Sequence, residues 1–202
     1  MRKLAVATVL AVLLISLLVT HDSRVEGFDL QGGRWLTPTT TFSVGIPGSD
    51  GLWNWNAAFE RAMFRWNEAT PFDFKIRRGR FEDPCDGRPT STSQGDFENG
   101  VGFAETVCGV EFGDRVLAHA SNWRVSGIYT QSNIIFNSEK DWGIYDGPYS
   151  VGRWSGIHDF RRVALHELGH SIGLGHEDDV PAIMASAATW GGGPSSGQLP
   201  MT

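Results

Sequence analysis

The segment HELGHSIGLGH, residues 166–176, places three histidines and one glutamate at a spacing that suits a metal centre. His166 and His170 are four residues apart, so on a helix their imidazoles project from one face and can meet a single Zn²⁺ at about 2.0–2.1 Å. Glu167 can reach the space beside the metal, where a water would be held. Zinc lowers the pKa of such a water to about 7, and a carboxylate can take its proton as the water attacks a peptide carbonyl. These residues predict a catalytic zinc site with Glu167 as the general base.

His176 has to satisfy a geometric condition before it can be the third ligand. Catalytic zinc usually has three protein ligands and a water. If the helix continued, His176 would lie about 9 Å further along its axis than His170, out of reach of the same ion. Gly173 resolves this, because a glycine can adopt positive φ and end the helix. The sequence predicts a helix that stops at Gly173 and a chain that turns back, so that His166, His170 and His176 bind one metal.

Two helices and several strands are needed to position this segment. The spacing of apolar residues predicts one helix over residues 54–69 and a second over residues 157–173. β-branched or alternating stretches predict strands within residues 34–46, 72–77, 116–120 and 132–137. The order of strand, helix, strands and helix indicates an α/β (α+β) fold with a mixed, twisted sheet and two main helices.

Cys85 and Cys108 are the only cysteines of the chain. They flank a polar, glycine-rich segment that is expected to have little to pack against. In an oxidising compartment a disulfide is the default, and closing a loop of this size would stabilise the fold by about 3 kcal/mol. A zinc site on these thiols is disfavoured, because the sequence has no Cys-x-x-Cys pair.

The N-terminus predicts export. Arg2 and Lys3 precede an apolar run, residues 4–19, which is short for a bilayer span and suits the core of a signal peptide. We therefore expect a signal peptide over residues 1–27 and a single exported domain over residues 28–202, secreted or periplasmic, monomeric and without stable membrane association after cleavage. An uncleaved N-terminal anchor is the alternative.

Length and charge exclude some classes of function. With 202 residues, 41% of them hydrophobic, the chain can form one domain with a substantial core. Its formal net charge of −6 argues against general attraction to nucleic acid or to anionic lipid.

The pattern His-Glu-x-x-His-x-x-Gly-x-x-His, followed by Met184 in DDVPAIMAS, resembles that of the metzincin zinc endopeptidases. Within that group the chain is most similar to the matrixins, the matrix-metalloproteinase-like peptidases, and especially to their compact microbial members. RWLTPTTTFSV, WNEATPFDFKI, VLAHA and IIFNSEKDW resemble matrixin strands and the end of the first matrixin helix. The resemblance runs from Arg34 to Ser186. It implies cleavage of proteins or peptides laid along an edge strand, and it implies that Met184 forms a hydrophobic base under the zinc without binding it.

Several positions depart from the matrixin pattern. His119 matches one ligand of a second, structural zinc, but Ile135 stands where its partner histidine is expected, so we predict no second zinc. Asn137 and Lys140 stand where acidic calcium ligands are expected. Ca²⁺ therefore remains possible but unsupported.

The region after the third histidine also differs. Glu177 stands where matrixins usually have serine and astacins glutamate, but Ser186 stands where astacins have a tyrosine, which favours the matrixin resemblance. Glu177 could bond a backbone or ligand group. The segment WGGGPSSGQLPMT is too rich in glycine and proline for the closing C-terminal helix of the family, which we expect to be missing. We also expect no cysteine-based latency segment.

The predicted function is a secreted zinc-dependent endopeptidase that hydrolyses protein substrates. One alternative is a catalytically weak or inactive zinc-holding module that binds peptides; the presence of Glu167 favours the enzyme. Another is a zinc peptidase of the two-histidine, distant-glutamate type, against which Gly173, His176 and Met184 argue.

Overall fold

The structure is a computed structural model that describes residues 29–90, 95–147, 152, 155–178 and 182–186. Its main element is a five-stranded sheet with the order β2-β1-β3-β7-β6. β1 pairs in parallel with β2 and β3, β3 pairs in parallel with β7, and β6 is the antiparallel outer strand. The strands are β1 (Thr39–Val44), β2 (Asp73–Arg78), β3 (Asn99–Ala104), β6 (Ala118–Val125) and β7 (Ile128–Asn137). The predicted α/β fold with a mixed sheet is confirmed.

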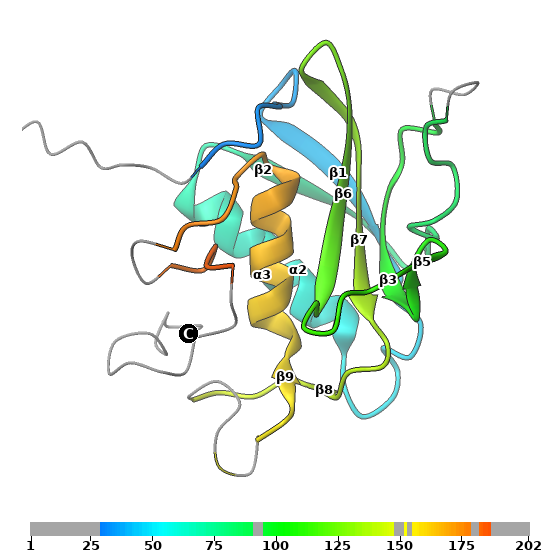
Figure 1. The fold of residues 1–202 in the computed structure, drawn as a ribbon, viewed down its shortest axis with the longest axis vertical. Coiled ribbons are helices and arrows are strands. Elements are labelled where there is room, and N and C mark those ends of the chain that lie inside the picture. The colour runs from blue at the N-terminus through cyan, green and yellow to red at the C-terminus, as the bar shows by residue number, and fades with distance from the viewer. Residues whose placement is uncertain (1–28, 91–94, 148–151, 153–154, 179–181, 187–202) are drawn as a thin grey trace, which may run out of the picture.

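Two helices, α2 (Trp55–Ala69) and α3 (Phe160–Ser171), pack against each other and against the sheet. Figure 1 shows α3 in front of α2, with the sheet beside them. The indole of Trp66 on α2 donates a hydrogen bond of 2.8 Å to the carbonyl of Leu165 on α3. The core between helices and sheet is rich in aromatic rings, among them Phe42, Phe136 and Phe160, all fully buried. This core holds α3 in a fixed place against the sheet.

The sequence of α2 explains where the helix begins and ends. Asn54 is the N-cap, and its side-chain oxygen accepts a hydrogen bond of 2.9 Å from the backbone of Ala57. The apolar positions of the predicted helix are buried: Ala58, Phe59, Ala62, Met63 and Trp66. Pro71 follows the end of the helix and disfavours its continuation.

A buried ionic cluster fixes the start of α3. Asp159, fully buried, is its N-cap and accepts a hydrogen bond of 3.3 Å from the backbone of Arg161. Its carboxylate also lies 3.5 Å from the guanidinium of Arg161 and 3.3 Å from that of Arg162. Burial raises the pKa of Asp159, while both arginines act in the opposite direction. No local pattern predicts this cluster, because its members interact through burial that only the fold provides.

The expectation that the cysteine-bracketed segment packs little is wrong, since β3 lies within it. Val101 is fully buried at the centre of β3. Gly100 is required by the close approach of a neighbouring loop, because an added Cβ would lie 2.4 Å from the carbonyl oxygen of Glu82. A glycine that allows another part of the backbone to approach makes the composition of β3 resemble that of a loop, so the strand was not predicted.

The strands β6 and β7 are longer than predicted and form a hairpin. The turn that joins them has only two residues, Ser126 and Gly127. Both have positive φ, 52° and 79°, as in the two-residue turns that match the twist of a hairpin. The hairpin extends β6 along α3, so that the outer strand of the sheet lies beside the histidine segment.

The remaining strands are short and were not predicted. They are β4 (Thr106–Val107), β5 (Val110–Glu111), β8 (Trp142–Gly143) and β9 (His158–Asp159). Within the part of the chain that the structure describes, no helix has the length and apolar character needed to cross a bilayer. The expected signal peptide, residues 1–27, and the expected lack of a closing helix after residue 186 lie outside the described residues.

The predicted disulfide is confirmed: Cys85 and Cys108 are bonded, with their Cα atoms 5.2 Å apart. It joins the loop before β3 to the β4–β5 turn across 23 residues of sequence.

Replacing both Cys85 and Cys108 by serine should lower the free energy of unfolding by about 3 kcal/mol, because the unfolded chain regains the freedom of the open loop. Urea denaturation followed by tryptophan fluorescence measures the change. The reduced parent is the control and should match the double variant. A loss below about 1 kcal/mol would contradict the structural role.

Candidate metal centre

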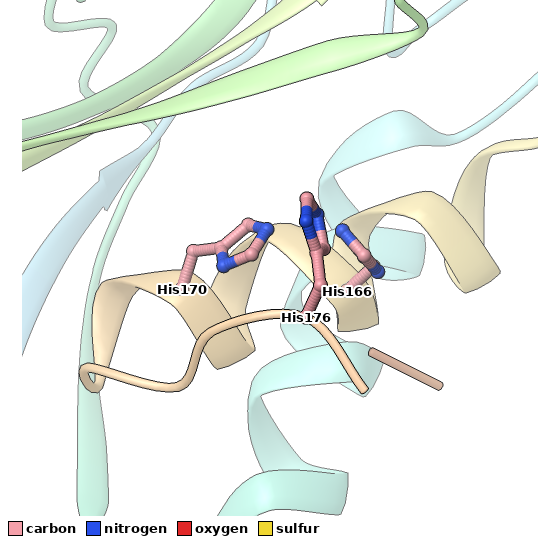
Figure 2. A group of neighbouring side chains, drawn as sticks. All are labelled: His166, His170 and His176. Carbon is pink, nitrogen blue, oxygen red and sulfur yellow. The ribbon is translucent and has the colours of Figure 1, made fainter. Parts of the chain in front are cut away.

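Three histidines converge at one end of α3. His166 and His170 project from the helix, and His176 comes from the chain that runs back beside it (Figure 2). Their ring centroids are 4.6 Å (His166–His170), 4.8 Å (His170–His176) and 5.3 Å (His166–His176) apart. One ring nitrogen of each lies within 4.8 Å of the others. Among the described residues this is the one group of three or more side chains that could hold a metal ion.

The turn at Gly173 creates this convergence. Gly173 has φ +99°, and its N–H donates to the carbonyl of His170 at 2.9 Å. The next residue, Leu174, donates to the carbonyl of Gly169 at 3.0 Å. This pair of bonds is the Schellman arrangement, in which a residue with positive φ ends a helix and turns the chain. The predicted end of the helix at Gly173 is confirmed.

Backbone carbonyls orient two of the imidazoles. The Nδ1 atom of His166 lies 2.7 Å from the carbonyl oxygen of Ile183, and that of His170 lies 2.8 Å from the carbonyl oxygen of Leu174. A carbonyl can only accept, so each contact favours the tautomer with the proton on Nδ1. The Nε2 lone pairs of both rings then remain available, as metal-bound histidines require.

Glu167 is buried, with 5% of its surface exposed. Burial raises its pKa to about 8, while a hydrogen bond from the backbone of Ala120 on β6 acts in the opposite direction. Burial lowers the pKa of the neighbouring His166 to about 4, and the nearby His170 adds to this shift. The imidazole of His166 is therefore neutral near pH 7, which is the form that binds metals.

Met184 is fully buried and packs against α3 at Gly169. It leaves no room for a side chain on Gly169, since an added Cβ there would lie 2.3 Å from the sulfur of Met184 and 3.0 Å from the Trp66 ring. The turn that carries Met184 is held by the backbone N–H of Glu177, which donates to the Met184 carbonyl at 2.8 Å. The packing fits the expected hydrophobic base; a role for the Glu177 side chain stays a prediction.

The donor set fits zinc. Three imidazoles with a neighbouring carboxylate that is not needed as a ligand are typical of catalytic zinc sites. Calcium gains no support from the structure, since Lys140 and Asn137, which stand where acidic ligands are expected, both donate hydrogen bonds to backbone carbonyls. The Nζ atom of Lys140 donates to the carbonyl of Asp114 at 3.1 Å, and the Asn137 amide donates to the carbonyl of Val116 at 3.2 Å. The absence of a second zinc at His119 stays a prediction.

Comparison with known proteins identifies the family. The profile described as matrixin matches residues 51–196, more than half of the chain. The chain belongs to the matrixin family. The resemblance read from the zinc motif and the flanking strands is thus confirmed.

Among matrixin relatives, Metalloendoproteinase 5-MMP of Arabidopsis thaliana is 31% identical over 137 residues, 66% of this chain and 33% of the relative. Matrix metalloproteinase-19 of Mus musculus is 26% identical over 157 residues, 76% of this chain and 25% of the relative. Interstitial collagenase of Oryctolagus cuniculus is 29% identical over 133 residues, 63% of this chain and 22% of the relative. The matched region therefore spans a third or less of each of these proteins.

Sequence reasoning missed the residues that surround the histidines. Asn122 on β6 donates to the carbonyl of His170 at 2.7 Å, and the amide of Gln31 lies 3.0 Å from its Nδ1 atom. Both contacts join residues far apart in the chain and belong to no local pattern. The three histidines are thus supported from the sheet and from the N-terminal segment as well as from α3.

Gly173→Ala should weaken zinc binding about tenfold or more and lower the free energy of unfolding by about 1–3 kcal/mol. A Cβ at this positive φ is strained and would lie 2.8 Å from the carbonyl oxygen of Gly33. Zinc affinity measured with a competing chelator tests this. Gly79→Ala is the control, because Gly79 also has positive φ but no atom near an added Cβ. Equal zinc affinity in the two variants would contradict the role of the turn.

In the metal-free protein, Glu167→Gln should stabilise the fold increasingly as the pH rises from 5 to 8. The folded parent holds a proton up to a pKa of about 8, whereas the unfolded chain releases it near the ordinary 4.5, so the free energy of unfolding of the parent falls across this window. The glutamine does not titrate, and the gap should widen by at most about 1.4 kcal/mol per pH unit.

Urea denaturation at several pH values, with a chelator present, measures this gap. Glu111→Gln, at an exposed position, is the control and should show none. If the difference in the free energy of unfolding between Glu167→Gln and the parent stays constant with pH, the proposed effect of burial on the Glu167 pKa is contradicted.

Proposed function

We propose that the chain is a secreted zinc endopeptidase that cleaves protein or peptide substrates, with His166, His170 and His176 holding the metal and Glu167 acting as general base. The family of zinc peptidases to which it belongs supports this. The single observation that carries the proposal is the convergence of three imidazoles, with a buried glutamate, Glu167, next to the first of them in the sequence. A site that only stores metal has no need of a base there.

Each residue of the site has a distinct task in the proposed reaction. Zinc, when bound, lowers the pKa of a water and polarises the carbonyl of the scissile bond. Glu167 accepts the proton of that water as the water attacks, and then passes the proton to the departing amine. The ionised form of Glu167 would be favoured by a cation held by the three imidazoles, which would offset the effect of burial on its pKa. Ala120 holds the carboxylate through its N–H.

The peptide is proposed to lie along β6. This strand is the outer strand of the sheet, and extended peptides commonly add to such an edge through backbone hydrogen bonds. The N–H of Ala120 on β6 bonds Glu167, so a peptide on the strand would pass close to the base. The curated relatives are much longer than the matched region, so their names do not identify the substrate of this chain.

Export follows from residues 1–27, proposed to be a signal peptide that leaves a monomeric domain over residues 28–202. The disulfide between Cys85 and Cys108 supports an oxidising compartment.

Cleavage of casein by the secreted, purified chain tests the proposal. The parent should bind about one zinc and digest casein, and Glu167→Ala should keep the zinc but lose activity by at least about a hundredfold, because only the base is removed. Glu111→Ala is the matched control and should cut like the parent. If the parent holds zinc and does not cut, the chain is a zinc-holding peptide-binding module and the proposed activity is wrong.

His176→Ala separates this site from a zinc peptidase with two histidines and a distant glutamate. Loss of a ligand should reduce zinc affinity by several orders of magnitude, measured by competition with a chelating dye. A variant that keeps both zinc and activity would contradict the three-histidine centre.

A further inference from the structure

The N-terminal segment Asp29–Trp35, here called the N-terminal strap, lies against the turn between the second and third histidines. The N–H of Gln31 donates to the carbonyl of Gly173 at 2.8 Å, and the N–H of Gly175 donates to the carbonyl of Asp29. Leu30 and Leu174 face each other between these bonds as an antiparallel bridge. These bonds form a short antiparallel pairing between the N-terminal strap and the backbone on both sides of Leu174.

The strap also completes the end of α3. The last carbonyls of a helix have no partner within it and must find one elsewhere. The indole of Trp35 donates to the carbonyl of Ser171 at 2.8 Å. The Trp35 ring packs edge-on against Tyr129, with centroids 5.9 Å apart. Trp35 thus provides the hydrogen-bond donor for the Ser171 carbonyl, next to His170. Without Trp35 this carbonyl would lose that partner.

A side chain of the strap reaches the second ligand itself. The amide nitrogen of Gln31 lies 3.0 Å from Nδ1 of His170, and its oxygen accepts a bond of 3.2 Å from Asn122. Asn122 also donates to the backbone carbonyl of His170. Asn122 therefore links β6 to the backbone of His170 and to Gln31, whose amide packs beside the His170 ring.

The β6–β7 hairpin anchors the strap. Arg124 donates to the carbonyl of Gln31 at 2.8 Å. The backbone of Arg34 accepts from Tyr129 at 2.8 Å and donates to Gly127 at 3.0 Å. Gly33 permits the close approach, since an added Cβ would lie 2.4 Å from the Tyr129 ring. The strap is thus fixed to the sheet on one side and to the metal-binding turn on the other.

We propose that Trp35 and Gln31 are positioning residues for the metal site, which fix the turn at Gly173 so that His176 meets His166 and His170 in one geometry. The proposal rests on the proposed zinc site. Residues that support metal ligands typically change metal affinity by about 10–100-fold when removed. A strap that served only the stability of the fold would leave the affinity of the folded protein for zinc unchanged.

Three variants of the full chain test the strap. Trp35→Phe keeps a ring but removes the donor to Ser171, and Gln31→Ala removes the amide at His170. Trp142→Phe is the matched control, because its indole also donates to a backbone carbonyl at 2.8 Å, that of Asn137. Zinc affinity is measured by competition with a chelating dye, and the visible spectrum of the Co²⁺ form reports ligand geometry independently of activity.

We expect Trp35→Phe and Gln31→Ala to weaken zinc binding by about tenfold or more and to alter the Co²⁺ spectrum. Trp142→Phe should lose stability in urea but keep the affinity and spectrum of the parent. If Trp35→Phe fails to fold, Gln31→Ala decides, since its side chain is exposed. If the parent binds zinc and the strap variants show the same zinc affinity and the same Co²⁺ spectrum as the parent, the inference is overturned. A parent that binds no zinc would instead overturn the proposed function.

Discussion

The turn at Gly173 is the constraint on which the metal centre depends. A helix that continued past Ser171 would carry the third histidine away from the first two. The positive φ of Gly173 ends the helix and sends the chain back beside α3. The hydrogen bonds around Gly173 stabilise this end of the helix, because the last carbonyls of α3 would otherwise lack partners. The convergence of the three histidines thus depends on one helix and on the way that helix ends.

Burial gives the same residues their chemistry. His166 is held neutral and Glu167 is held close to its point of titration because both lie in a region from which water is largely excluded. The packing of Met184 against Gly169, and of Trp66 beneath α3, closes the site from below. Packing of the core therefore keeps His166 in the neutral form that binds metals. For Glu167 burial acts against the ionised form that a base needs, and a cation held by the imidazoles would offset it.

The sequence was enough to predict the parts of the fold that follow local rules. The helical spacing in residues 54–69, the end of α3 at Gly173 and the disulfide were all confirmed. β3 was missed because its glycines do not follow a strand pattern: Gly100 admits the backbone of another loop, and Gly102 lies against the side chain of Phe81. The length of β6 and β7 was underestimated, since a turn of only two residues looked like part of a longer loop.

The candidate site divides in the same way. The proposed ligands and base lie within eleven consecutive residues, 166–176, so a local pattern predicts them. Asn122 and Gln31 are brought to His170 from 48 and 139 residues away. Only the fold supplies such contacts, and a single sequence carries no trace of them.

The most direct test of the central claim is the X-ray absorption spectrum of the zinc-loaded protein at the zinc edge. If the turn at Gly173 brings all three histidines to one ion, the spectrum should fit three imidazole nitrogens and one oxygen at about 2.0–2.1 Å. A fit with only two imidazoles, or with a ligand set that His176→Ala leaves unchanged, would contradict the claim.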